Sequence, residues 1–165
     1  MHPGVNDPHD RTPEQAQQLA RDAAAAMWSR DYVAQGLGMT LAHVQPGAAR
    51  LTMQVRQDMV NGHAICHGGM LFALADTAFA YACNSYNQNT LASACSIDFL
   101  APAQLGDTLV AEATERALGG RSGVYDVTVS TAGGKVVALF RGKSARIKGE
   151  VTASFDENSS RQESP

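Results

Sequence analysis

Hydrophobic and polar residues alternate along most of the chain, and one long apolar run interrupts the alternation. Alternation with a period of two predicts strands over residues 38–46 and 48–56, because successive side chains of a strand point to opposite faces. In the second segment Ala49, Leu51, Met53 and Val55 share the apolar face. The same pattern predicts four later strands, over residues 90–101, 106–118, 121–132 and 135–147.

The apolar run predicts a helix over residues 68–84 that other structure covers. Residues 70–82 contain only two plainly polar side chains, Asp76 and Thr77. A helix on the surface of a protein has a polar face, so this helix is expected to be wrapped by the sheet. A second helix is predicted over residues 13–30, beginning with an N-cap and a proline at its first position.

Runs of strands with one inserted helix predict an α+β fold, a curved antiparallel sheet around a long central helix. An open sheet edge in each copy also predicts self-association. We expect one domain over residues 13–148. The polar composition of residues 1–12 and 149–165 is typical of disordered tails.

Composition excludes several classes of partner. The 165 residues carry a formal net charge of −3, which provides no field to attract nucleic acid or an anionic membrane. No apolar run is long enough to span a bilayer, and the first residues lack the apolar segment of a signal peptide. The odd number of cysteines, 3, favours a reducing compartment, so we expect a cytoplasmic protein.

Asp76 is the first candidate for a catalytic group. A carboxylate within an apolar helix is costly unless it is paired, hydrogen-bonded or used, and burial perturbs its pKa in the way typical of catalytic acids and bases. A structural acid that accepts hydrogen bonds from loop amides is the alternative, and the residues alone leave it open.

Gly68 and Gly69 begin the same helix, where free N–H groups and the helix dipole favour an anion such as the oxyanion of acyl transfer. Close helix packing is the alternative explanation for the two glycines. Asp76 lies about 12 Å further along the helix axis, too far to act on the same carbonyl. If both groups serve one reaction, they must come from two copies of the chain with antiparallel central helices.

Three polar side chains near these positions, Asn61, His67 and Thr77, are candidates to hold water or a substrate carbonyl. Cys66, at the helix start, is either a nucleophilic thiol or a packed residue. His63, Cys66 and His67 have a spacing that suits zinc, but no second pair of ligands accompanies them, so no metal is expected. Four basic residues over 141–148 are either a solvated strand end or a phosphate contact.

The segment VNGH…CHGGMLFALADTAFA resembles the signature of hotdog-fold acyl-CoA thioesterases of the PaaI type. Further similarity lies in ACNS, SIDFLAP, GGRSGVYDV and FRGKS, so the resemblance covers about residues 13–148. The sequence contains no Gly-x-Ser-x-Gly motif of a serine hydrolase and no phosphate-binding Gly-x-x-x-x-Gly-Lys-Ser/Thr loop.

The resemblance implies a homotetramer, a dimer of hotdog dimers, with active sites between subunits. It implies that Asp76 attacks the thioester or activates water, that the Gly68 amide polarises the carbonyl, and that Asn61 and Thr77 orient the reacting groups. His67 and Gly69 take supporting roles in substrate binding. It implies no metal and no cofactor, because coenzyme A is part of the substrate.

The resemblance further implies aryl-acetyl-CoA substrates, phenylacetyl-CoA or its ring-hydroxylated forms, in phenylacetate degradation. Other short or medium acyl-CoAs are the alternative. A lyase of the same fold would carry His followed by Phe-Pro-Gly, which is absent. A non-catalytic acyl-CoA-binding module would lack the acid and usually adds a DNA-binding segment, for which there is no basic helix here.

Overall fold

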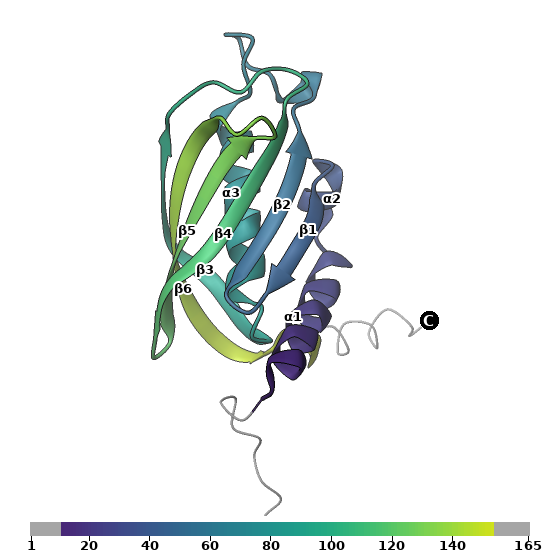
Figure 1. Cartoon of the computed structure of the whole chain (residues 1–165), viewed down its shortest axis with the longest axis vertical. Coiled ribbons are helices and arrows are strands. Elements are labelled where there is room, and N and C mark those ends of the chain that lie inside the picture. The colour runs from purple at the N-terminus through teal and green to yellow at the C-terminus, as the bar shows by residue number, and fades with distance from the viewer. Residues whose placement is uncertain (1–10, 154–165) are drawn as a thin grey trace, which may run out of the picture.

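The computed structural model describes residues 11–153, which form a six-stranded antiparallel sheet curved around one long helix (Figure 1). The strand order is β1-β2-β4-β5-β6-β3. The strands are β1 (Thr40–Gln45), β2 (Ala48–Gln54), β3 (Gln88–Phe99), β4 (Thr108–Gly119), β5 (Ser122–Thr131) and β6 (Val136–Glu150). The predicted α+β hotdog architecture is confirmed.

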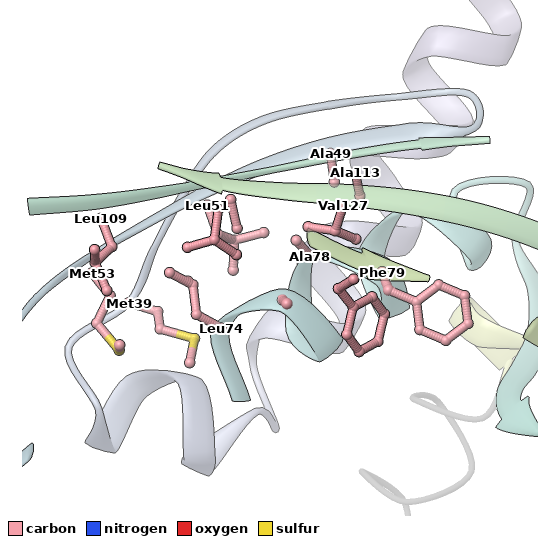
Figure 2. Close-up of a cluster of buried hydrophobic side chains, with 14 of the residues drawn as sticks. Met39, Ala49, Leu51, Met53, Leu74, Ala78, Phe79, Leu109, Ala113 and Val127 are labelled. Atoms are coloured by element: carbon pink, nitrogen blue, oxygen red, sulfur yellow. The ribbon is translucent and has the colours of Figure 1, made fainter. Parts of the chain in front are cut away.

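The central helix α3 (Gly68–Cys83) crosses the concave face of the sheet (Figure 1). Figure 2 shows the core between them, where side chains of β2, β4 and β5 meet α3. Leu51 and Met53 of β2 are fully buried, as their alternation predicts, and they face Leu74 and Ala78 of the helix. Apolar burial of this kind stabilises the fold by about 25 cal/mol per Å².

The predicted N-terminal helix is α1 (Pro13–Trp28), which lies beside β1 at one edge of the sheet (Figure 1). Its first turn is a capping box, in which the Thr12 hydroxyl accepts the Gln15 N–H and the Gln15 side chain accepts the Thr12 N–H. Gln17 Nε2 donates to the Val44 carbonyl at 2.8 Å and so ties α1 to β1.

The sheet covers α3 on one side only. Leu71, Leu74, Ala78 and Phe79 face the sheet and are buried, whereas a stripe at helical spacing stays partly exposed. That stripe consists of Ala73, Asp76, Thr77 and Ala80. The sheet packs around α3 as predicted, and this partly exposed stripe is the part of the helix that the sheet leaves uncovered.

Local structure differs from the sequence prediction in three places. A short helix α2 (Tyr32–Gly36) and a 3-10 turn η2 (Gln57–Met59) occupy segments without a predicted element. Strand β6 continues past the predicted domain end at 148, and Val151 is buried against Ala23 and Ala26 of α1. Residues 149–153, the last five that the structure describes, therefore belong to the domain, because the apolar side chain of Val151 packs against α1. The predicted disorder of residues 1–10 and 154–165 lies outside the described residues.

Strand β3 forms the other edge of the sheet, and several of its apolar side chains face solvent. Leu91 is 58% exposed and Phe99, its last residue, is 55% exposed. Within residues 11–153, no helix is both long and apolar enough to cross a membrane.

Candidate active site

A groove of about 450 Å³ lies between the start of α3 and the segment that follows β3. Its walls come from the loop before α3, the first turns of α3, and residues 99–103. The lining residues are Asn61, Ile65, Cys66, Gly68, Leu71, Phe99, Leu100, Ala101, Pro102 and Ala103. Two of the predicted catalytic residues, Asn61 and Gly68, therefore share one groove, whose other walls are mostly apolar.

The start of α3 leaves one backbone N–H uncommitted. His67 is the N-cap, and its Nδ1 accepts the Gly69 N–H at 2.8 Å, while its carbonyl accepts the N–H groups of Met70 and Leu71. Within residues 11–153, no acceptor takes the Gly68 N–H. Because Gly68 also lines the groove, its amide is placed to bind a carbonyl oxygen or an oxyanion there.

The bond to Gly69 assigns His67 a definite role. Nδ1 accepts a hydrogen bond from the Gly69 N–H, so the neutral ring carries its proton on Nε2. His67 orders the helix start and thereby positions the Gly68 amide. A role of Gly69 in substrate binding stays a prediction, and its N–H would have to leave His67 to take part.

Asn61 uses one end of its carboxamide to build the loop. Its Oδ1 accepts the N–H of His63 at 2.9 Å and that of Ile65 at 3.4 Å, which stabilises a turn containing Ala64 at a φ of 60°. Among the described residues no acceptor takes its Nδ2 amide. The amide group therefore remains available as a donor within the groove.

Asp76 lies outside this groove, on the partly exposed stripe of α3. Burial raises the pKa of its carboxyl above the ordinary aspartate value. The thiol of Cys95 on β3 lies 4.0 Å from Asp76 Oδ1. Among the described residues no loop amide donates to Asp76, and its catalytic role stays a prediction.

Thr77 stands next to Asp76 on the stripe, and its hydroxyl donates to the Ala73 carbonyl at 2.7 Å. The hydroxyl proton is thus used within the helix, and the oxygen lone pairs remain to accept a hydrogen bond. One chain brings Asn61 and Gly68 together but keeps Asp76 and Thr77 apart from them. This separation agrees with the axial distance derived from the sequence, and the catalytic roles of all four residues stay predictions.

Other candidates have structural partners. Cys66 is buried, burial raises the pKa of its thiol, and its backbone N–H donates to the Ala103 carbonyl, so it suits packing better than nucleophilic attack. Arg141 is paired with Asp126 at 2.7 Å on the exposed face of the sheet, and Arg146 donates to Gln88. Among the described residues no group of three or more His, Cys, Asp or Glu side chains is close enough to hold a metal.

Sequence reasoning missed Phe99, whose ring lies against Gly68. A Cβ atom built on Gly68 would come within 3.0 Å of Phe99 Cζ. An aromatic residue that ends a strand and stays 55% exposed is a signal for a binding surface, but that exposure is visible only in the fold.

Comparison with known proteins agrees with this geometry. Residues 63–138 match the family model described as the thioesterase superfamily. The acyl-coenzyme A thioesterase PaaI of Escherichia coli K12 is 53% identical over 129 residues, which cover 78% of this chain and 92% of that protein. This chain belongs to the thioesterase superfamily. Within the superfamily it is a hotdog-fold acyl-CoA thioesterase of the PaaI type.

Solved structures of similar proteins have the same fold. The E. coli PaaI protein from the phenylacetic acid degradation operon superposes with a TM-score of 0.81 at 50% identity, covering 82% of this chain and 98% of that one. The protein smu.793 of Streptococcus mutans UA159, solved with bound acetyl CoA, superposes with a TM-score of 0.65 at 25% identity, covering 68% and 90% of the two chains.

Proposed function

We propose that this thioesterase hydrolyses aryl-acetyl-CoA thioesters, such as phenylacetyl-CoA or its ring-hydroxylated forms, to the free acid and coenzyme A in phenylacetate degradation. The observation that carries the proposal is the uncommitted Gly68 N–H in a mostly apolar groove beside Asn61. The similarity to a protein of the phenylacetic acid degradation operon supports the acyl class. Hydrolysis of other short or medium acyl-CoAs is the second candidate.

In the proposed reaction, the thioester carbonyl oxygen accepts a hydrogen bond from the Gly68 N–H. The bond strengthens as negative charge develops on that oxygen, and the Asn61 amide adds a second donor. The Asp76 carboxylate either attacks the acyl carbon, expelling CoA thiolate and leaving a mixed anhydride for water to hydrolyse, or removes a proton from an attacking water. Both routes consume one water, and no metal or cofactor takes part.

Two copies of the chain are needed to complete this site. The partly exposed stripe of α3 carries Asp76, and the open edge strand β3 carries exposed apolar side chains, so both surfaces suit a second copy. A dimer with antiparallel α3 helices would bring Asp76 of one subunit to Gly68 of the other. We place such dimers in a homotetramer, and we place the enzyme in the cytoplasm, where its free cysteines stay reduced.

The direct test is hydrolysis of a panel of acyl-CoA thioesters, followed as release of free thiol. Preferred turnover of aryl-acetyl-CoA is the expected result. Preferred turnover of aliphatic thioesters would keep the mechanism and replace the substrate class by the second candidate. Absence of turnover with every thioester would overturn the proposed function.

Replacement of Asn61 by Asp is expected to lower kcat more than it raises KM. Asp keeps the oxygen that accepts the His63 and Ile65 N–H groups but lacks the Nδ2 donor, so the loop is preserved while a bond to the transition state is lost. Asn61→Ala removes both functions and serves as the harsher comparison. An unchanged kcat with a raised KM in Asn61→Asp would make Asn61 a binding residue only.

The pH profile of kcat/KM is expected to fall on the acid side at a pH above the ordinary aspartate range. Asp76 acts in its ionised form, and burial raises its pKa, so protonation removes the base at a higher pH than for an exposed aspartate. Initial rates between pH 4 and pH 8 measure this limb. An acid limb at the ordinary aspartate pKa would contradict this prediction, because it would show that the Asp76 carboxylate is as well solvated in the enzyme as an aspartate exposed to water.

A further inference from the structure

The side chain of Phe99 closes one side of the candidate groove. Phe99 ends the edge strand β3, and its ring lies so close to Gly68 that a Cβ atom on that residue would be 3.0 Å from Cζ and 3.2 Å from Cε1. Only a glycine allows the ring to approach the helix start so closely. The ring lines the groove together with Asn61 and Gly68, so an acyl group bound in the groove would contact it.

The wall that contains Phe99 is held in place by hydrogen bonds on both sides. The N–H groups of Leu100 and Ala101 donate to the Val137 carbonyl at 2.9 Å and 3.3 Å, which ties the segment to β6. The Cys66 N–H donates to the Ala103 carbonyl at 2.8 Å, which ties it to the loop before α3. Lys135 Nζ donates to the Pro102 carbonyl. The groove is therefore formed before a substrate binds, as ligand sites usually are.

The groove offers little besides apolar contact next to the carbonyl-binding amide. Asn61 supplies its polar side chain, whereas Ile65, Leu71 and Pro102 supply apolar surface. A carbonyl held at the Gly68 N–H places the first atoms of the acyl group beside the Phe99 ring. In an aryl-acetyl group only one methylene separates the carbonyl from the aromatic ring, so that ring would lie close to Phe99. Two aromatic rings attract each other at centroid separations of about 4.5–7 Å.

We propose that Phe99 is a specificity-determining residue, whose ring contacts the acyl group and favours an aryl-acetyl over an aliphatic chain. The inference rests on the proposed function and adds to it the residue that selects the acyl class. Burial alone would favour any apolar chain of similar size, so the selectivity comes from the ring–ring contact.

The test compares kcat/KM for phenylacetyl-CoA and hexanoyl-CoA in the wild type and in Phe99→Leu. Leu keeps apolar bulk but removes the ring, so the ratio of the two values is expected to fall about two- to ten-fold against the aryl substrate. Phe99→Tyr keeps the ring and should keep the ratio. Val33→Ala, which alters an exposed apolar side chain of α2 outside the groove and outside β3, should also keep it.

The possible outcomes distinguish a failure of the specificity role of Phe99 from a failure of the proposed function. An unchanged ratio in active Phe99→Leu, an equal loss for both substrates, or a wild type that prefers hexanoyl-CoA overturns the specificity role of Phe99. A wild type inactive on every thioester instead overturns the proposed function. Size-exclusion chromatography of each variant separates a changed oligomer from a changed acyl pocket, because only the latter alters the ratio while the assembly stays the same.

Discussion

Replacement of Asp76 by Asn is expected to lower kcat for thioester hydrolysis by about 10²–10⁴-fold, the usual contribution of a general base. Asn has the same shape but can neither attack the acyl carbon nor accept a proton from water. The carboxylate lies on the partly exposed stripe of α3 with a pKa raised by burial, which is the environment of a poised base. Release of free thiol from phenylacetyl-CoA measures the loss.

The same variant should fold at least as stably as the wild type. Because the folded-state pKa of Asp76 is raised, its ionised form destabilises the fold at neutral pH, and this cost disappears only when pH falls below the unfolded-state pKa. Asn removes the cost, so the melting temperature at pH 7 should not fall. Asp22→Asn, at an exposed acid of α1, is the matched control and should retain full activity. Full activity of Asp76→Asn would contradict the assignment.

Replacement of Gly68 by Ala is expected to lower kcat by about 10²-fold, the lower end of the loss of an oxyanion donor. The backbone N–H remains, but the new Cβ would lie 3.0 Å from the Phe99 ring and forces the ring or the helix start to move. The carbonyl then loses its aligned donor. Gly62→Ala is the matched control, because a Cβ at that position meets nothing within 4 Å.

Mixing the two inactive variants tests whether the site is shared. In a hybrid dimer of Asp76→Asn and Gly68→Ala chains, one site combines the intact Gly68 of one subunit with the intact Asp76 of the other. Random exchange of subunits should therefore restore about one quarter of the wild-type activity. Activity that stays at the level of the separate variants would place both residues in a site within one chain.

Local patterns in the sequence were sufficient for most secondary structure. Alternation along β2 put Leu51 and Met53 in the core, and Thr12 and Pro13 marked the start of α1. Each signal depends on neighbours within a few residues, so it does not require knowledge of the fold. Helix α2 was missed because five residues carry too little periodicity to be recognised. The burial of Val151 was missed because its partners on α1 are remote in sequence.

The features of the candidate site also fall into those that local sequence predicts and those that only the fold creates. The sequence alone was enough to predict the catalytic groups, since Asp76 in an apolar helix and two glycines at the start of that helix are local features. The tertiary structure decided that Asn61 and Gly68 share a groove, that His67 occupies the Gly69 N–H, and that Phe99 covers Gly68. These contacts join a loop, a helix start and a strand end, and only the folded chain brings such distant segments within a few ångströms of one another.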